Sequence, residues 1–324
     1  MSSTNVSHKL KINAAQKTTV ATEQIINKAA ELIVDCESIL FTSGAGMGVS
    51  SGFGTFQGIA ASVWLPLLQP SKLDYTDIVN PSWFHKPQGN SSNHDTANFA
   101  YAFWSDRYNA YTSTAPHLGY FICKQWSELS HIKSAFSFTS NIDGHWIKSG
   151  WNESSVLECH GSIHYMQCVN DCRKRIWATK NELKLTVDPK TNCVTDPLPL
   201  CSDCNGLARP NVLMFDDWAK FSGNRHDESF CHYGQFKSDI AAAKTKLLVI
   251  ELGAGITVPS VRIESELAFT DKRWTAHLIR INPLAEHAVI DAYRNKSKGQ
   301  ALELPLDALT ALTLIDREVK KKLK

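Results

Sequence analysis

A glycine-rich stretch in the first fifth of the chain constrains the fold more than any other feature. It follows the apolar residues Ile39–Phe41 and reads Gly44-Ala-Gly-Met-Gly-Val-Ser-Ser-Gly-Phe-Gly-Thr-Phe-Gln-Gly58, with six glycines. The apolar run predicts the end of a buried strand. Because glycine has no Cβ, N–H groups in such a turn can approach a ligand closely, and α/β proteins bind phosphate groups there. The sequence therefore predicts an α/β protein with a phosphate-binding turn; a loop that only reverses the chain is the alternative.

The stretch differs from the fingerprint of nucleotide-dependent dehydrogenases. That fingerprint is G-x-G-x-x-G, and Val49 stands at the position of its third glycine. A dehydrogenase also carries an acidic residue at the end of a second strand about 20 residues later, and we find none at that spacing. A hydride-transferring dehydrogenase is therefore disfavoured.

Composition indicates a globular protein without a nucleic-acid or membrane partner. The 324 residues are 43% hydrophobic and 20% charged, enough for a sizeable core, and the formal net charge is only +2. No apolar run approaches the about 18 residues of a membrane span. Nine cysteines without a secretion signal indicate a reducing compartment, so we expect the cytoplasm or the nucleus. Residues 1–20 are expected to form a flexible tail, and because they lack arginine a mitochondrial transit peptide is less expected.

Two closely spaced cysteine pairs predict a metal site. Cys168 and Cys172 form the first pair, and Cys201 and Cys204 form the second. Four thiolates at such spacing converge on one ion, and they favour a tetrahedral Zn²⁺ with a structural role. Cys193 lies between the pairs and could compete as a ligand, although it has no close cysteine neighbour in the sequence.

Taken whole, the glycine-rich stretch resembles the signature of the sirtuin family, G-A-G-x-S-x-x-S-G-I-P-D-F-R-G. Gly48 replaces the first serine of this signature, Gly54 the proline, Thr55 the aspartate and Gln57 the arginine. In the family the arginine helps to hold the cofactor, so its loss is the most consequential departure. The resemblance implies that NAD contacts Gly44, Ala45, Gly46, Thr55, Phe56 and Gln57.

Two further motifs follow in family order and supply the candidate catalytic residues. Ser140-Asn141-Ile-Asp143-Gly resembles T-Q-N-I-D-G and follows a predicted strand; alone it would indicate a turn. The resemblance implies that Asn141 orients the nicotinamide ribose and that Asp143 binds the nicotinamide carboxamide, while Ser140 replaces a glutamine that contacts a ribose. Val156-Leu-Glu-Cys-His160-Gly-Ser resembles L-E-L-H-G-S and implies that His160 deprotonates a ribose hydroxyl, a role that suits imidazole near neutral pH.

A later segment resembles the part of the family that binds substrate. Ala208–Asp217 is similar to R-P-D-V-V-x-F-G-E, which implies that Val212 and Leu213 pair with a substrate peptide by β-augmentation. It also implies that Phe215 lines a channel for the acyl-lysine, although Asp216 stands in place of the following glycine. A core strand followed by a turn is the purely structural interpretation.

Two strand ends complete the implied cofactor site. The turn after Lys246–Leu252 resembles the family's G-T-S-L-x-V, and the strand His277–Asn282 ends like its I-x-I-N. In the first of these turns, Ala254 and Gly255 replace the threonine and the serine of the family, so two hydroxyl side chains are missing. The resemblance implies cofactor contacts at Gly253, Ala254 and Asn282.

The resemblance covers roughly residues 38–285 and implies an α/β fold. We expect a doubly wound, parallel, Rossmann-like sheet, with a helical insertion at about 59–115 and a zinc-ribbon module at about 163–207. The alternation of strand and helix patterns supports α/β independently. The catalytic domain is expected to span 21–315, and a charged C-terminal tail to cover 316–324.

The implied function is NAD-dependent removal of an acyl group from lysine in a protein or peptide, with nicotinamide and O-acyl-ADP-ribose as products. Two alternatives stay open. The departures at Gln57, Ser140 and the 253–255 turn motivate ADP-ribosyl transfer to a protein, or hydrolysis of NAD, on the same fold. A non-catalytic NAD or ADP-ribose sensor is the other, and the retention of Asn141, Asp143 and His160 argues against it. No arginine stands between Gly58 and Arg107, so the sequence gives no reason to expect a preference for acidic acyl groups.

Overall fold

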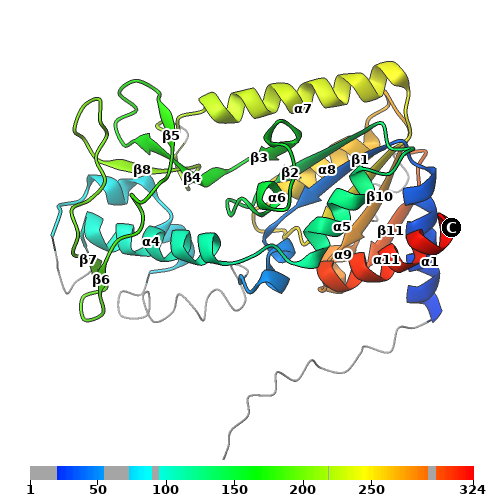
Figure 1. Cartoon of the computed structure of the whole chain (residues 1–324), viewed down its shortest axis with the longest axis horizontal. Helices are drawn as coiled ribbons and strands as arrows, with labels where there is room; N and C mark the ends of the chain where they lie inside the picture. The colour runs from blue at the N-terminus through cyan, green and yellow to red at the C-terminus, as the bar shows by residue number, and fades with distance from the viewer. Residues whose placement is uncertain (1–19, 55–72, 90–94, 218, 291–296) are drawn as a thin grey trace, which may run out of the picture.

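The computed structural model describes residues 20–54, 73–89, 95–217, 219–290 and 297–324 (Figure 1). The predicted tail therefore lies outside the described residues except at its last position, Val20. The predicted cofactor contacts Thr55, Phe56 and Gln57 also lie outside them.

A parallel sheet forms the centre of the larger lobe. Its strands are β1 (Ser38–Ser43), β2 (Ser134–Thr139), β3 (Val156–Glu158), β9 (Leu247–Leu252), β10 (Ala276–Ile281) and β11 (Ala301–Leu304). Within the described ranges it has six strands in the order β11-β10-β9-β1-β2-β3, and every neighbouring pair is parallel. Ser38 at the start of β1 pairs with Ser134 of β2 on one side and with Leu247 of β9 on the other. The order reverses at β1, as in a doubly wound sheet, which confirms the predicted fold class.

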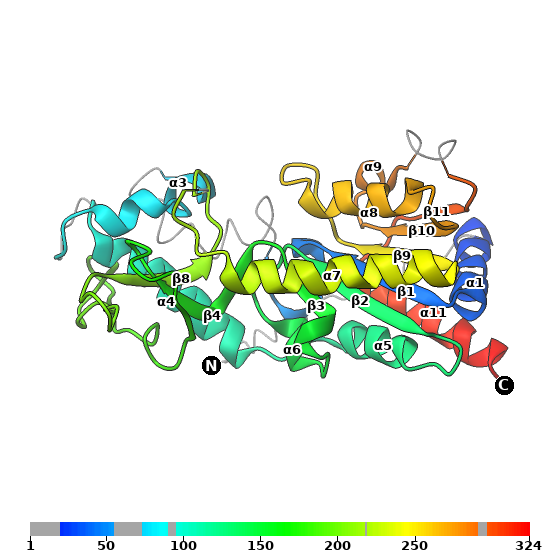
Figure 2. The same cartoon turned by 90° about the horizontal axis from the view of Figure 1, so that it is seen from above.

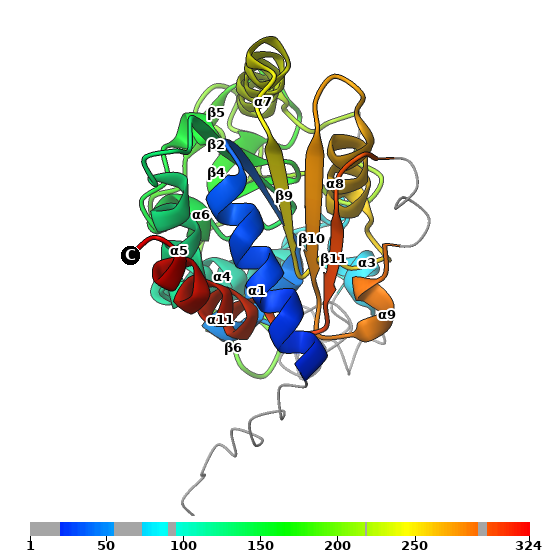
Figure 3. The same cartoon turned by 90° about the vertical axis from the view of Figure 1, so that its right-hand side faces the viewer.

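Helices cover both faces of this sheet because both faces of its strands are apolar. Ile39 and Phe41 of β1 pack into one core, whereas Leu40 between them packs into the other, as the period of two in a strand requires. The first core is closed by α1 (Val20–Asp35), α5 (Leu118–Ser127), the short α6 (His145–Lys148) and α11 (Ala308–Lys322). The second is closed by α7 (Asn224–Ala243) and α8 (Ser260–Thr270), with the short α9 (Ala285–Ala288) beside them (Figures 2 and 3).

A smaller lobe lies beyond the carboxyl ends of the strands. It combines α3 (Tyr75–Ile78), the 3₁₀ helix η4 (Pro81–His85) and α4 (Ala97–Ser113) with an antiparallel sheet in the order β5-β4-β8. The strands of that sheet are β4 (Gly161–Cys168), β5 (Ile176–Ala178) and β8 (Ala208–Val212), and a hairpin of β6 (Val187–Asp188) and β7 (Cys193–Val194) packs beside α4. Figure 1 shows α7 beginning beside the smaller lobe and running along the larger one. Short 3₁₀ helices are η1 (Ala45–Met47), η2 (Val49–Ser51) and η5 (Glu153–Ser155).

The aromatic stripe of α4 is buried on almost every side. Phe99, Tyr101, Phe103 and Trp104 are all at most 2% exposed and belong to the core of the smaller lobe. These aromatic side chains therefore serve to pack the core of the smaller lobe, and a helix buried on all sides needs no polar face. The antiparallel sheet begins at Gly161 and ends at Val212, so it covers a longer stretch of the sequence than the predicted zinc module at 163–207.

The predicted boundary of the C-terminal tail at residue 316 is wrong. Helix α11 continues to Lys322 and buries Ile315, Asp316 and Val319 against α1 and α5. Trp126 of α5 donates its indole N–H to Asp316 Oδ1 at 3.1 Å, so that carboxylate is anchored inside the lobe. The lysines of the last turn suit the negative end of the helix dipole, and their presence does not stop the opposite face from packing.

Among the described residues, no helix is both long enough and apolar enough to cross a lipid bilayer.

Candidate active site

A cavity of about 1080 Å³ lies between the carboxyl ends of the parallel strands and the smaller lobe. Open α/β sheets bind ligands at this edge, where the strand order reverses. Every described residue that the sequence predicts to contact a cofactor, a substrate or the reacting atoms lines it. They are Gly44, Ala45, Gly46, Ser140, Asn141, Asp143, His160, Val212, Leu213, Phe215, Gly253, Ala254 and Asn282.

Two glycine turns touch each other at the floor of the cavity. Gly44 donates its N–H to Leu252 O, and Gly46 donates to Gly253 O, both at 3.0 Å. A Cβ on Gly46 would lie 2.7 Å from Gly253 Cα, so both positions lack room for a side chain. Gly253 also has φ of +60°, a left-handed conformation that favours glycine. The close contact explains why glycine stands in both turns.

Replacing Gly253 with alanine is expected to destabilise the protein and weaken NAD binding. The new Cβ would lie 2.4 Å from the carbonyl carbon of Gly46, and alanine at this φ is strained, so we expect a loss of about 1–3 kcal/mol in the free energy of unfolding. Urea unfolding and calorimetric titration with NAD measure both effects. Gly255→Ala is the matched control, because a Cβ there meets nothing within 4 Å. Equal behaviour of the two variants would contradict this account.

The loop after β2 is fixed by hydrogen bonds to the glycine turn. The backbone N–H of Asn141 donates to Thr139 Oγ1 at 3.1 Å, and its side-chain amide donates to Gly44 O at 3.1 Å. Asp143 is buried, and its Oδ1 accepts the N–H of His145 at 2.8 Å. Burial raises the pKa of the Asp143 carboxyl to about 6. One carboxylate oxygen is thus held by the backbone of this chain, at the wall of the cavity.

His160 follows β3 and its backbone is anchored on both sides. Cys159 donates its N–H to Thr139 O at 2.8 Å, and His160 O accepts the N–H of Leu213 at 2.9 Å. Its imidazole Nε2 lies 3.3 Å from Ser260 Oγ. Burial lowers the pKa of His160 to about 4, with a smaller contribution from the neighbouring His226. The imidazole is therefore neutral near pH 7, as a general base must be.

The predicted substrate residues form another wall of the cavity. Leu213 uses its N–H for His160 O, so any pairing of a peptide with this strand relies on other backbone groups. A buried ion pair of Arg209 with Asp217 closes the turn that follows, with two N–H···O bonds of 2.7 and 2.8 Å. Asp216, at the position of the family's glycine, has φ of +59°, which aspartate tolerates better than most residues. The turn therefore contains a left-handed residue at Asp216.

Asn282 is also at the cavity, but its side chain is already used. Its Nδ2 donates to Ala254 O and its Oδ1 accepts the N–H of Leu284, both at 3.0 Å. The side chain thus braces two loops at the wall, and the predicted ribose contact remains a prediction.

Sequence reasoning missed several residues of the cavity wall. Tyr75, Arg107 and Tyr111 reach it from the helical insertion, where Arg107 donates to the Tyr111 hydroxyl and lies over the ring of Tyr75. The sequence has no arginine between Gly58 and Arg107, but the fold brings Arg107 itself to the cavity. The site therefore contains a cation. Other missed residues include His226, Phe230 and Ser260, from the starts of α7 and α8. No motif marks them; only the long-range packing of these helices brings them in.

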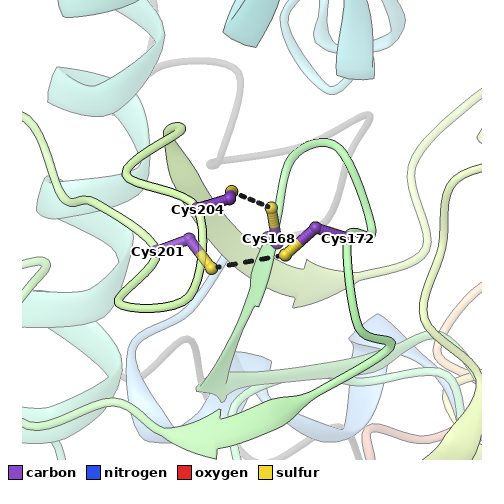
Figure 4. A group of neighbouring side chains, drawn as sticks. All are labelled: Cys168, Cys172, Cys201 and Cys204. Atoms are coloured by element: carbon purple, nitrogen blue, oxygen red, sulfur yellow. Dashed lines mark hydrogen bonds between the residues drawn. The ribbon is translucent and has the colours of Figure 1, made fainter.

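The four predicted cysteine ligands converge in the smaller lobe (Figure 4). The sulfurs of Cys168, Cys172, Cys201 and Cys204 all lie within 4.8 Å of one another, with separations of 3.5 and 3.7 Å across the two pairs. Four sulfurs at about 2.3 Å from a tetrahedral zinc are separated by about 3.8 Å, so this donor set fits Zn²⁺. Cys193 lies apart, buried with its sulfur 3.8 Å from Thr96 Oγ1.

Comparisons with known proteins give a consistent result. The profile of the Sir2 family matches residues 44–227. An NAD-dependent protein deacylase of Leptospira interrogans is 27% identical over 249 residues, which cover 76% of this chain and 82% of the relative. A probable bifunctional ADP-ribose hydrolase/ADP-ribosyltransferase of Fusarium oxysporum is 30% identical over 135 residues, 40% of this chain; the match spans only 22% of that relative's length. A crystal structure of a Sir2 homolog–NAD complex has a TM-score of 0.61 at 17% identity, over 92% of this chain and 94% of that one, which shows the shared fold.

Proposed function

Because this chain belongs to the Sir2 family, we propose that it is an NAD-dependent protein lysine deacylase. The observation that carries this proposal is the cavity where Asn141, Asp143 and His160 meet the two glycine turns. The names of several relatives, such as the Leptospira deacylase, support the same activity. Its substrates would be NAD and a protein or peptide with an acylated lysine.

The residues of the cavity fit a dinucleotide. The glycine turns present backbone N–H groups without a Cβ in the way, and a Cβ would fill the cradle at Gly44 as well, 2.9 Å from Gly253 O. A volume of about 1080 Å³ slightly exceeds the usual range of ligand pockets, about 300–1,000 Å³, as expected for a site that takes two substrates. The four thiols fit one Zn²⁺ that stabilises the smaller lobe and stays out of the chemistry.

NAD would supply an anomeric carbon that carries nicotinamide as a leaving group. Asn141, whose side-chain amide is tied to Gly44 O, would set the position of the adjacent ribose. The free oxygen of Asp143 would accept the nicotinamide amide, and His160 would take the proton of a ribose hydroxyl after the acyl oxygen has attacked. Val212, Leu213 and Phe215 would hold the acylated peptide. The thiols of the zinc site also support the proposed location in the cytoplasm or nucleus, where they stay reduced.

The proposal is tested by nicotinamide release from NAD, with and without acetylated and longer-acyl lysine peptides. We expect release that requires the acyl peptide, together with one equivalent of deacylated peptide. Release without peptide would instead indicate hydrolysis of NAD. Binding of NAD without any release would refute the enzyme and leave a sensor.

Binding of NAD is expected to weaken as the pH falls through about 6, because Asp143 becomes protonated there. Its pKa is raised by burial, so the fold favours the neutral acid: this group's stabilising contribution is present at low pH and is lost as the pH rises through about 6. The ionised carboxylate needed for the nicotinamide amide therefore exists only above that pH. At pH 5 we expect about tenfold weaker binding than at pH 8 in calorimetric titrations.

ADP-ribose is the matched ligand for this experiment because it lacks nicotinamide. Its affinity should change much less over the same range, and Asp143→Asn should remove the difference between the ligands. His160, with a pKa of about 4, is already neutral at pH 5 and contributes little to this step. A parallel loss of affinity for both ligands would contradict the assignment.

ADP-ribosyl transfer to a protein is the second candidate, favoured by the match to the Fusarium relative. In that reaction an acceptor side chain would replace the acyl oxygen at the same cavity. Transfer of labelled ADP-ribose from NAD to protein, without any need for acyl peptide, would favour it over deacylation.

A further inference from the structure

Ser260, which no sequence motif marks, lies against the imidazole of His160. It is the first residue of α8, lines the cavity, and places its Oγ 3.3 Å from Nε2 of His160. The position of this hydroxyl is well defined because α8 is packed on the sheet. Val261 is 1% exposed, and Ser265 bonds Thr42 of β1 through Oγ–Oγ1 at 2.7 Å.

A neutral imidazole carries one N–H and one bare nitrogen, and only the bare nitrogen can take up a proton. Nε2 is the ring nitrogen that lies beside Ser260, and a serine hydroxyl can donate to a bare nitrogen. A hydrogen bond donated by Ser260 would keep Nε2 bare and leave the ring proton on Nδ1.

We propose that Ser260 is a positioning residue for His160, holding the bare Nε2 toward the cavity until a ribose hydroxyl takes its place. This inference rests on the deacylase function proposed above. When the ribose hydroxyl donates to Nε2, its proton passes to that nitrogen and the ribose oxygen gains the bonding electron pair. The imidazolium keeps the N–H of its other ring nitrogen, and the Ser260 oxygen can then accept from the new Nε2–H. No other reactant is needed.

The titratable side chains near the His160 ring have other partners, so Ser260 is the residue that can position it. His226 on α7 bonds Cys159 O at 3.1 Å, so it faces the backbone beside His160. The acids of the neighbouring elements are already engaged with cations. These pairs are Glu158 with Arg225, and Glu264 with Lys237. Among the described residues, the side-chain hydrogen bond to the His160 ring comes from Ser260.

The test reads the imidazole directly in the full chain, labelled with ¹⁵N-histidine and free of ligand. The spectrum of His160→Ala identifies the His160 signals. In the wild type we expect an N–H nitrogen and a hydrogen-bonded bare nitrogen; in Ser260→Ala the bare nitrogen should move downfield, and Ser260→Thr should restore it. For a bond of ordinary strength, kcat/KM for the acyl peptide should fall about three- to tenfold in Ser260→Ala and recover in Ser260→Thr.

Ser238→Ala on the exposed side of α7 is the control, and it should change neither readout. An unchanged Nε2 signal in Ser260→Ala would overturn the proposal, whatever happens to the rate. A lowered rate in both Ser260→Ala and Ser260→Thr without a change in that signal would also overturn it. If the signal moves as expected but the wild type releases no nicotinamide, the contact holds and the deacylase function is what fails.

Discussion

Replacing His160 with alanine is expected to lower the steady-state rate of peptide deacylation by about 10²–10⁴-fold. The imidazole is neutral at the pH of the assay because burial lowers its pKa to about 4, and alanine offers no group to take the ribose proton. Deacylated peptide and O-acyl-ADP-ribose, quantified by mass spectrometry, measure the effect. Binding of NAD should change much less, since the glycine turns and Asp143 remain.

His232→Ala is the matched control, because His232 is exposed on α7 and its removal deletes the same group outside the cavity. It should leave the rate unchanged. A His160→Ala variant that binds NAD, keeps its unfolding midpoint and retains more than half of the rate would assign the base to another residue.

Replacing Cys201 with serine is expected to remove the zinc and unfold the smaller lobe. Cys201 is 1% exposed, so a serine there would be a buried hydroxyl that cannot replace the thiolate as a zinc ligand. Structural zinc contributes roughly 10–16 kcal/mol of apparent binding free energy in small zinc domains, and much of that stabilisation should be lost from this lobe. Elemental analysis should fall from one zinc per chain to a small fraction, and urea unfolding should show an earlier transition.

The control for this variant is Cys231→Ser, which changes an exposed thiol on α7. It should keep its zinc and its unfolding curve. Retention of one zinc per chain in Cys201→Ser would show that Cys193 or another group serves as the fourth ligand.

Local motifs allowed several segments of the cavity wall to be predicted. The turn at Gly44–Gly46 and the Asn141–Asp143 loop each combine a strand end with residues whose chemistry is visible in the sequence, and the sheet places such strand ends along one edge. The cysteine pairs were predictable for a similar reason, since close spacing brings two thiols together before any tertiary packing.

The remainder of the cavity depends on contacts between distant segments. Arg107 and Tyr111 lie on a helix whose pattern indicates only core packing, and Ser260 is an ordinary serine until α8 packs on β1, β9 and β10 and brings it to His160. The error at the C-terminus has another cause. The lysines after Val319 suggested a solvated tail, whereas the spacing of Ala311, Ile315 and Val319 marks a buried face that continues through them.

The position of β1 in the sheet has a consequence for how the chain is made. β1 pairs with β9, which follows it by roughly 200 residues, and at 5–20 residues per second a ribosome needs roughly 10–40 s to supply that partner. Throughout that time an apolar strand has one edge without its neighbour, a state that invites pairing with other chains. Production of this protein should therefore depend on how well a nascent chain is shielded, so slower growth at low temperature or added chaperones should raise the yield more than a change of tag.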